Sequence, residues 1–311
     1  MRGRPGLPLV CLCVLLAALL VFPGAVPNSP GHLGSLTETV LPWLGLAVLP
    51  LAAWALVRRS LAAVVCVLVP AVAWVVLFGP GLLAPAEQGT ARPDFRVLTL
   101  NVGGDRTDAP ATARAVLASG ADVVALEKVP RTVLPVYARE LRARYPHHAA
   151  GDTLGLWSRY PLRDVEKLDL GGAWPHAVRA VARTPAGDTA LYAVRLPSVR
   201  VTLDRGFTVG RRDASADLLA DRLAQDPARR VVVFGDLNGS LRDRGLARLT
   251  GPLRSTHEEA GAGPGFTWPA SFPVVRLDHV LVRGLSATGT TVLPDLGSDH
   301  RPVLTGLRND A

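Results

Sequence analysis

The sequence is poor in charged residues and nearly free of cysteine. Only 19% of its 311 residues are charged, against 49% that are hydrophobic, and its mean hydropathy is +0.25. Disordered chains have the opposite balance, so intrinsic disorder is excluded. The three cysteines, Cys11, Cys13 and Cys66, all lie in apolar stretches near the N-terminus. No disulfide framework, cysteine-based zinc site or cysteine nucleophile is therefore possible in the rest of the chain.

The shortage of charge is uneven along the chain. Residues 1–95 contain five basic and three acidic residues, whereas residues 96–311 contain 29 basic and 23 acidic ones, a net charge of +6. These 216 residues suffice for one large domain with a full core. The sequence therefore predicts a membrane-like N-terminal region followed by a mildly basic globular domain.

Three apolar stretches in the first region contain no charged residue. They cover residues 7–26, 39–57 and 61–78, which are 20, 19 and 18 residues long. A helix needs about 20 apolar residues, with a range of about 17–25, to cross a bilayer. Pro70 interrupts the third stretch, but membrane helices tolerate proline. We therefore expect three transmembrane helices within residues 1–78.

The arginines of this region predict its orientation. Arg2 and Arg4 precede the first stretch, the loop 27–38 has no Lys or Arg, and Arg58 and Arg59 lie between the last two stretches. The positive-inside rule places the N-terminus and the Arg58–Arg59 turn in the cytoplasm. The chain is thus expected to be a multi-pass cell-membrane protein with an extracytoplasmic globular domain. The proline- and glycine-rich residues 79–94 read as a short, stiff linker between the two.

Two alternatives remain for the apolar stretches. Residues 1–25 also resemble a signal peptide, with a basic start, an apolar run and small residues at Gly24 and Ala25. Its removal would still leave the globular domain outside. The second and third stretches could instead form a buried hairpin of a soluble protein, which their complete lack of charge disfavours.

From residue 95 onward, apolar strand patterns alternate with amphipathic helix patterns. The expected strands cover 95–102, 122–127, 154–158, 177–184, 189–196, 230–236, 276–283 and 303–307, and the expected helices 111–119, 133–144 and 211–224. This alternation predicts an α/β domain over residues 95–308.

Acidic and polar residues lie near the ends of these strands. Asn101, Glu127, Asp236 and Asn238 are at strand ends, Asp278 is within the 276–283 strand, and Asp299 and His300 precede the last strand. Sites in α/β sheets form at strand ends and in the loops after them. Carboxylates about 5 Å apart repel each other by roughly 3 kcal/mol at an effective dielectric constant near 20, so several together need a cation. Oxygen ligands without cysteine favour Mg²⁺, with Mn²⁺ as an alternative.

The same residues suggest separate roles in metal binding, proton transfer and positioning of water. Glu127 and one further group could hold the metal, and His300, oriented by Asp278, could take a proton from water. Asp236 and Asn238, two residues apart, would share one face, position the attacking water and donate to a phosphate oxygen. Turns often use single Asp or Asn residues, so Asn101 alone could have that structural role. His279 should point to the opposite face of its strand from Asp278.

Six segments together resemble the endonuclease/exonuclease/phosphatase (DNase-I-like) superfamily. They are Thr-Leu-Asn-Val (99–102), Val-Val-Ala-Leu-Glu (123–127), Gly-Leu-Trp-Ser-Arg-Tyr-Pro-Leu (155–162), Gly-Asp-Leu-Asn (235–238), Arg-Leu-Asp-His-Val-Leu (276–281) and Gly-Ser-Asp-His-Arg-Pro-Val (297–303). The resemblance implies a four-layer α/β sandwich, with two packed mixed sheets flanked by helices, and a Mg²⁺-dependent phosphoesterase.

The resemblance also implies a role for each matching residue. Asn101 matches a metal-site and phosphate contact, and Glu127 the principal Mg²⁺ ligand. Asp236 and Asn238 match the pair that orients water and binds phosphate. The last motifs match a catalytic His300 with its partner Asp278, and Asp299 matches an acidic residue of the metal or water shell.

One position departs from the family pattern. The family usually has His, sometimes Tyr, where this chain has Arg195, a position that contacts phosphate and aids the leaving group. Arginine can stabilise a phosphate charge but cannot donate a proton at neutral pH. We therefore expect Arg195 to bind substrate, with reduced activity or a shift toward leaving groups that need no acid.

Three spans before such a domain resemble a membrane-anchored actinobacterial branch associated with glycopeptide resistance and with lipid-linked phosphates of the envelope. The leading prediction is thus a membrane-tethered, extracytoplasmic phosphoesterase whose partners are the lipid bilayer and a phosphate-containing, lipid-linked substrate. A surface-tethered nuclease is the first alternative, but a net charge of +6 is modest for nucleic-acid binding. A non-catalytic binding protein is the second. The sequence leaves the bond cleaved, the number of metals and the oligomeric state open.

Overall fold

A computed structural model describes residues 6–83, 92–104, 107–172 and 177–310. The chain divides into two compact units. The helical unit comprises Met1–Leu83 with two later segments, Arg200–Val209 and Arg242–Arg244. The sheet unit comprises Ala84–Val199, Gly210–Leu241 and Gly245–Ala311. The two later segments of the helical unit were not expected from the sequence.

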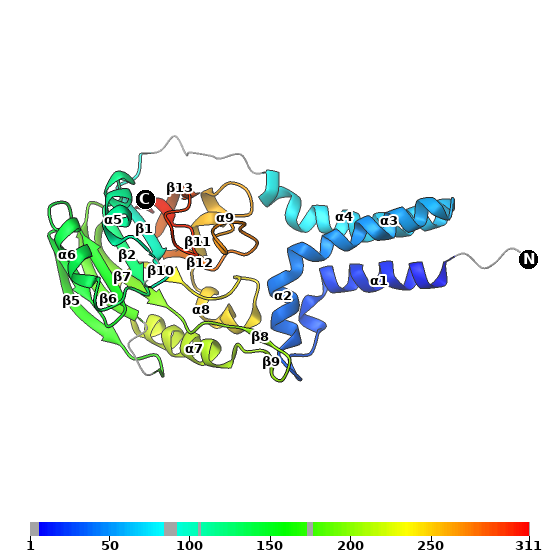
Figure 1. Cartoon of the computed structure of the whole chain (residues 1–311), viewed down its shortest axis with the longest axis horizontal. Helices are drawn as coiled ribbons and strands as arrows, with labels where there is room; N and C mark the ends of the chain where they lie inside the picture. Colours follow the sequence, from blue (N-terminus) through cyan, green and yellow to red (C-terminus); the bar gives the residue numbers. More distant parts are fainter. Residues whose placement is uncertain (1–5, 84–91, 105–106, 173–176, 311) are drawn as a thin grey trace, which may run out of the picture. The chain divides into compact units, whose positions relative to one another are not determined.

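Two six-stranded mixed sheets form the sheet unit (Figure 1). The first sheet has the order β13 (Leu285–Val292), β14 (Val303–Asn309), β1 (Phe95–Asn101), β2 (Val123–Glu127), β4 (Leu154–Ser158) and β3 (His147–Ala150). The second sheet has the order β11 (Arg254–Ser255), β12 (Asp278–Arg283), β10 (Arg230–Asp236), β7 (Gly187–Arg195), β6 (Ala177–Thr184) and β5 (Leu162–Leu168).

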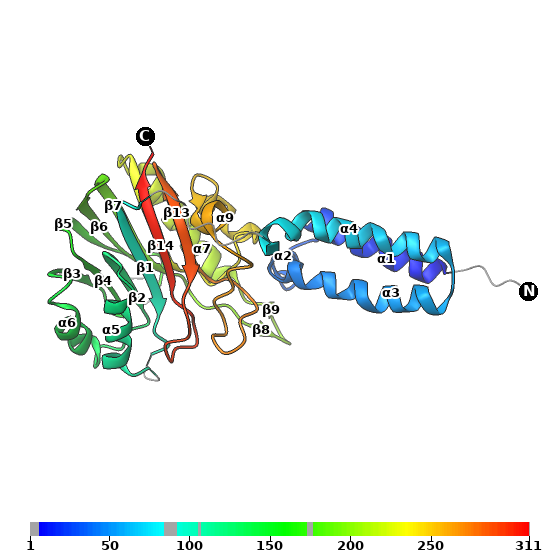
Figure 2. The ribbon, with the colours of Figure 1, turned by 90° about the horizontal axis from the view of Figure 1, so that it is seen from above.

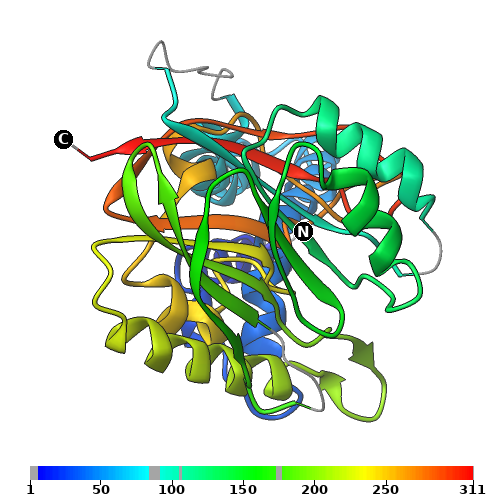
Figure 3. The ribbon, with the colours of Figure 1, turned by 90° about the vertical axis from the view of Figure 1, so that its left-hand side faces the viewer.

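Helices cover the outer face of each sheet, as Figure 3 shows. Helices α5 (Ala109–Ala118) and α6 (Leu134–Leu141) pack on the first sheet. Helix α7 (Gly210–Gln225) and the short α8 (Ala247–Thr250), which follows the 3₁₀ turn η3 (Arg244–Leu246), pack on the second. Helix α9 (Thr256–Ala260) follows β11. The predicted α/β fold, with two mixed sheets flanked by helices, is confirmed.

Successive side chains of each central strand point to opposite faces of its sheet, so they pack alternately into two different cores. On β10, Val232 and Phe234 face the core between the sheets, whereas Val231 and Val233 face the core under α7. All four are completely buried. Because both faces are covered, such strands read as continuous apolar runs rather than as alternating ones.

Four strands at the sheet edges were not predicted from the sequence. Most of β5 is exposed and charged, and β13 is rich in Gly and Thr, with a bulge between Ala287 and Gly289. The third, β3, has four residues and begins with two histidines, and the fourth, β11, has two residues. Edge strands bury little apolar surface, so their sequences carry little of the pattern on which a prediction depends.

The helical unit consists of apolar helices and a small hairpin (Figure 2). Its elements are α1 (Leu7–Val21), the 3₁₀ turn η1 (Pro23–Ala25), α2 (Leu33–Leu44), the 3₁₀ turn η2 (Gly45–Ala47), α3 (Val48–Val57), α4 (Leu61–Leu83) and the paired β8 (Val201–Thr202) and β9 (Gly206–Phe207). Helices α1, α3 and α4 share an apolar core.

The expectation of three transmembrane helices is wrong for the first of them. Helix α1 has 15 residues, a length of about 22 Å against a hydrocarbon core of about 30 Å. It ends before the 3₁₀ turn at Pro23. Within the described part of the chain, two helices are long and apolar enough to cross a membrane, Leu33–Val57 with 25 residues and Leu61–Leu83 with 23.

Both long helices are largely exposed, with 17% of their most apolar windows buried. A core helix of a soluble protein would be mostly buried, so this exposure favours a lipid environment. Helix α4 runs through Pro70 and Pro80 to Leu83. The first residues of the expected linker, 79–83, are therefore helical, and its residues 84–91 lie outside the described residues.

A close contact joins α4 to the bend between α2 and α3. The indole Nε1 of Trp74 donates a 2.7 Å hydrogen bond to the carbonyl oxygen of Pro42. A Cβ at Gly45 would lie 2.2 Å from that nitrogen, so the contact needs glycine there. The indole thus ties α4 to the region where α2 ends.

The charged residues Glu38 and Arg244 form the main polar contact of the helical unit. The Glu38 carboxylate accepts from the Arg244 backbone N–H at 2.8 Å and from its Nε at 3.0 Å. The guanidinium also donates to the carbonyl oxygens of Val26 and Pro23, both at 3.0 Å. A Cβ at Gly34, one turn earlier, would lie 2.7 Å from the guanidinium carbon. Glu38 therefore holds an arginine that lies 206 residues later in the sequence.

Replacing Glu38 by Gln should destabilise the protein by about 2–3 kcal/mol, because hydrogen bonds to charged groups contribute about 1.5–3 kcal/mol. Thermal unfolding in detergent, followed by tryptophan fluorescence, measures this loss. Glu140→Gln on the exposed face of α6 is the matched control and should change the midpoint little. Equal midpoints for the two variants would show that the Glu38 contact does not stabilise the fold.

Candidate active site

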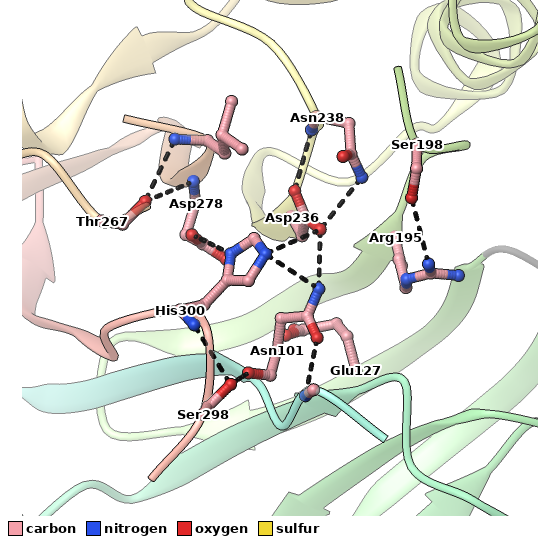
Figure 4. A network of polar contacts seen from close by, with 12 residues as sticks. Asn101, Glu127, Arg195, Ser198, Asp236, Asn238, Thr267, Asp278, Ser298 and His300 are labelled. Carbon is pink, nitrogen blue, oxygen red and sulfur yellow. Dashed lines mark hydrogen bonds and ion pairs between the residues drawn. The ribbon is translucent and has the colours of Figure 1, made fainter. Parts of the chain in front are cut away.

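The ends of five strands bring the predicted polar residues together. Asn101 and Glu127 are register partners at the ends of the parallel strands β1 and β2. Asp236, at the end of β10, is paired with Arg195 on β7 and with Asp278 on β12. In Figure 4, side chains from both sheets point toward one another around Asp236. The site therefore lies where the two sheets of the sheet unit present these strand ends.

Backbone geometry explains the Gly-Asp-Leu-Asn segment. Gly235 has φ 147°, and a Cβ there would lie 1.8 Å from the carbonyl oxygen of Val194. Asn238 has φ 49°, a left-handed conformation that Asn adopts more readily than most residues. The segment thus combines close strand packing with a sharp turn directly after Asp236.

Asp278 and His300 form a buried pair. The imidazole Nδ1 donates to the Asp278 carboxylate at 2.8 Å, and both side chains are at most 6% exposed. The other ring nitrogen, Nε2, lies 3.4 Å from Asn101 Nδ2 and 4.0 Å from Asp236 Oδ2. The pairing fixes the orientation of the ring and directs Nε2 toward Asp236.

Amide groups surround the Asp236 carboxylate. It accepts from Asn101 Nδ2 at 2.8 Å, and from the Asn238 backbone N–H and Nδ2, both at 2.9 Å. Asn238 Nδ2 also donates to the Leu196 carbonyl oxygen at 2.9 Å. Both amide hydrogens of Asn238 are therefore engaged within the protein. In this arrangement Asn238 positions Asp236, and its role as a phosphate donor stays a prediction.

Glu127 is completely buried. Among the described residues, only one of its two carboxylate oxygens has a hydrogen-bond partner. Its Oε1 accepts a 2.6 Å hydrogen bond from the Thr99 hydroxyl. Its Oε2, like Asp278 Oδ1, is buried and has no hydrogen-bond partner among the described residues. Burial raises the pKa of Glu127 well above its usual value, and the charges of Asp278 and Asp236 raise it further. An ionised Glu127 therefore calls for a positive charge beside Oε2.

The remaining site groups also have displaced pKa values. Burial and then the charge of Asp278 raise the pKa of Asp236 to about 6. Burial lowers the pKa of His300, but the charge and hydrogen bond of Asp278, helped by Asp236, outweigh it and raise that pKa to about 9. Several groups with raised pKa values at one place are typical of sites that bind cations or transfer protons.

The residues present fit a divalent cation. Ligand atoms of Asp236, Asp278 and His300 lie within 4.8 Å of one another. However, Asp278 Oδ2 is bonded to His300 and Asp236 to two amides. Glu127 Oε2 and Asp278 Oδ1 are therefore the carboxylate oxygens of this cluster that have no partner among the described residues. Oxygen-rich ligand sets of this kind suit Mg²⁺ or Mn²⁺ rather than zinc.

Two predicted residues lie at the margin of the cluster. Asp299 is exposed, and its Oδ1 would be 3.0 Å from a Cβ added at Gly103. Arg195 is partly exposed, with Nη2 3.4 Å from Ser198 Oγ and a buried Nε that has no hydrogen-bond partner among the described residues. Its guanidinium is thus placed at the strand edge with donors left for an anion.

His279 points away from the cluster, as predicted. It is buried, its Nε2 contacts the Gly239 carbonyl oxygen at 2.9 Å, and burial lowers its pKa to about 3. The neighbours Asp278 and His279 therefore serve different faces of β12, as the period of a strand requires.

Three supporting residues were missed in the sequence. Thr99 holds Glu127 and lies two residues before Asn101, so strand alternation could have identified it. Ser298 donates to the Asn101 carbonyl oxygen at 2.5 Å and accepts from the His300 backbone N–H at 3.1 Å. Thr267 accepts from the backbone N–H groups of Leu277 and Asp278. Nothing in the sequence around Thr267 signals this contact.

Comparisons with known proteins agree with this fold. An uncharacterized protein, YbhP, of Escherichia coli (strain K12) is 26% identical over 251 residues, covering 69% of this chain and 96% of YbhP. D. rerio TDP2 complexed with a single strand DNA product is 17% identical, with a TM-score of 0.57, covering 69% of this chain and 99% of TDP2. A mannosyl-6-phosphatase of Bacteroides thetaiotaomicron is 15% identical, with a TM-score of 0.53, covering 68% and 99%.

A family model extends over the strands and loops that build the cluster. It matches residues 98–300, from the middle of β1 to His300. Members of that family generally hydrolyse phosphoester bonds and typically depend on a divalent metal. The chain belongs to the endonuclease/exonuclease/phosphatase family.

Proposed function

We propose that this protein is a membrane-anchored, Mg²⁺-dependent phosphoesterase that hydrolyses a phosphate ester or anhydride on a lipid-linked substrate. The single observation that carries the phosphoesterase assignment is the buried Asp278–His300 pair facing Asp236, next to the unsatisfied Glu127 carboxylate. This arrangement joins a proton acceptor to a cation site in one place. The association with the actinobacterial resistance branch is part of the proposal and rests on the sequence resemblance.

His300 is the proposed acceptor of a proton from the attacking water in the metal-bound site, where a cation would offset the carboxylate charges that raise its pKa. Its Nδ1–H is held by Asp278, which leaves Nε2 as the working nitrogen. Asp236 lies 4.0 Å from that nitrogen and is fixed by Asn101 and Asn238. The Asp236 carboxylate can thus orient a water molecule toward the phosphorus atom while His300 removes its proton.

Glu127 would hold the cation through Oε2, with Asn101 Oδ1 and Asp299 completing the protein's share of the ligands. A bound divalent cation would neutralise phosphate oxygens and polarise the bond under attack. Arg195 would bind another phosphate oxygen by a charge-assisted hydrogen bond. Its constant positive charge stabilises the negative phosphate group but supplies no proton to the leaving group.

The exposure of the long apolar helices supports membrane anchoring. Leu33–Val57 and Leu61–Leu83 would cross the bilayer as a pair, joined by the turn at Arg58 and Arg59. The positive-inside rule then places this turn in the cytoplasm and the residues after α4 outside. This extracytoplasmic orientation does not depend on whether the shorter α1 crosses the bilayer. A tether in the membrane favours substrates that share the membrane.

A nuclease is the second candidate function. TDP2, which shares the fold, was crystallised with a single strand DNA product. The net charge of +6 over residues 96–311 is compatible with a polyanion. A strong salt dependence of DNA binding would favour this function, because binding of phosphates by Lys and Arg releases counterions.

Removing His300 should abolish most of the activity. We expect His300→Ala to lower phosphate release by about 10²–10⁴-fold, the usual contribution of a general base. The assay uses the detergent-purified chain with Mg²⁺ and a panel of undecaprenyl pyrophosphate, phospholipids and plasmid DNA. His148→Ala, an exposed histidine on β3, is the matched control. Turnover of lipid lost only in His300→Ala supports the proposal, whereas equal turnover by both variants contradicts it.

Mg²⁺ should stabilise the wild type and not Glu127→Gln. At about 100 times its Kd a ligand stabilises a protein by about 2.7 kcal/mol, which raises the midpoint of a domain of this size by roughly 5–10 °C. In EDTA the variant should unfold at a higher temperature than the wild type, because it lacks a buried carboxylate that repels Asp236 and Asp278. Glu258→Gln, exposed on α9, serves as control. A full Mg²⁺ shift in Glu127→Gln would place the cation elsewhere.

Neutralising Arg195 should weaken substrate binding. Loss of a hydrogen bond from a charged group costs about 1.5–3 kcal/mol, so Arg195→Gln should lower kcat/KM by about 10–100-fold. Arg195→Lys keeps the charge and should recover part of the loss. Steady-state kinetics on the substrate found in the panel measures both. Unchanged kinetics in Arg195→Gln would remove Arg195 from the phosphate site.

A further inference from the structure

The hairpin of β8 and β9 carries exposed apolar residues at its tip. Its strands pair Val201 with Phe207 and Thr202 with Gly206. Leu203 is fully exposed and Val201 is 65% exposed. An isolated two-stranded hairpin is marginally stable in water, and exposing two large apolar side chains on one adds no stability. The apolar tip therefore calls for a function outside the folding of the hairpin itself.

The hairpin is fixed to the loop between α1 and α2. The backbone N–H of Phe207 donates to the carbonyl oxygen of Gly31 at 2.9 Å, and the Phe207 side chain is buried. A Cβ on Gly206 would lie 2.5 Å from that same Gly31 oxygen, so two glycines allow the backbones to approach. The hairpin is thus an integral part of the helical unit.

Its location within that unit is the end opposite the Arg58–Arg59 turn. Gly31 lies just before α2, whereas Arg58 and Arg59 lie between α3 and α4, at the other end of the Leu33–Val57 helix. Figures 1 and 2 both show β8 and β9 beside α2, away from that turn. In a membrane-spanning helical unit this end marks a boundary between lipid and water.

The charges around the tip match a lipid headgroup layer. Arg200 and Arg205 are both exposed and flank Val201 and Leu203, while Asp204 contacts the Arg205 side chain. An apolar tip between arginines resembles segments that insert about 5–10 Å into the interface. Each basic residue near an anionic membrane surface contributes about 1 kcal/mol of attraction.

We infer that the β8–β9 hairpin inserts Val201 and Leu203 into the bilayer interface and binds anionic lipid headgroups through Arg200 and Arg205. The inference rests on the membrane anchoring in the proposed function. The exposed apolar residues of the helices and the exposed Val201 and Leu203 belong to the same helical unit, so one lipid surface could cover both. Only the segment 196–200 separates the hairpin from Arg195 in the sequence. The hairpin would therefore link recognition of the membrane surface to the strand that carries the proposed phosphate ligand.

Depth-dependent quenching tests this inference. The full-length chain with Cys11, Cys13 and Cys66 replaced by Ala receives one new cysteine, labelled with a fluorescent dye, in vesicles of phosphatidylcholine and phosphatidylglycerol. Leu203→Cys reports on the hairpin, Val69→Cys on the exposed face of α4, and Val165→Cys on the exposed strand β5. Nitroxide lipids labelled at the top or the middle of the acyl chain, and iodide in water, are the quenchers.

We expect the label at 203 to lose fluorescence to the shallow nitroxide, the label at 69 to the deep one, and the label at 165 to iodide alone. Replacing Arg200 and Arg205 by Gln should reduce the shallow quenching at 203 to the level seen in phosphatidylcholine alone. Quenching at 69 but not at 203 would overturn the hairpin inference and leave the anchor intact. Protection of 203 from iodide and nitroxide alike would identify a protein contact instead and also overturn it. No lipid quenching at 69 would overturn both the anchor and the inference.

Discussion

The constraint on which the sheet unit depends is the burial of three carboxylates at neighbouring strand ends. Glu127, Asp236 and Asp278 are each at most 1% exposed, and their mutual repulsion is strong in a medium of low dielectric constant. Different neighbouring groups stabilise each of the three carboxylates. Asp278 is paired with His300, and Asp236 is held by two amides. One oxygen each of Glu127 and Asp278 has no partner among the described residues. A cation completes this arrangement better than protonation, because the free oxygens then gain a partner without losing their charge.

Much of this site could be predicted because the strands that form it are fully buried. A strand such as β10 must be apolar on both faces, so the first polar residues after it, Asp236 and Asn238, stand out in the sequence. The same reasoning found Asn101, Glu127 and Asp278. It could not assign hydrogen-bond partners, because the second amide hydrogen of Asn238 is bonded to Leu196, 42 residues away in the sequence. Edge strands such as β5 were missed because exposed strands have no apolar pattern to detect.

The apolar region shows where counting uncharged residues fails. Residues 7–26 meet the length of a span, yet α1 ends at Val21, before the 3₁₀ turn that begins with Pro23. Proline at that point and the glycine after it stop the helix without changing the hydropathy. Conversely, the charge of Glu38 placed residues 33–38 outside the second apolar stretch expected from the sequence. It is accommodated because Arg244 satisfies it from a distant part of the chain, which hydropathy along the sequence cannot reveal.

The two later segments of the helical unit connect the fold to the proposed function. Residues 200–209 follow β7 and residues 242–244 follow β10, the strands that end in Arg195 and Asp236. Both segments thus occur after strands of the second sheet that supply site residues. A soluble phosphoesterase needs neither an exposed Leu203 nor an arginine bonded to a glutamate of an apolar helix. Their presence in these two loops supports the proposal that the membrane determines which phosphate groups the site encounters, so that specificity would depend on the lipid surface as well as on the contacts around Asp236.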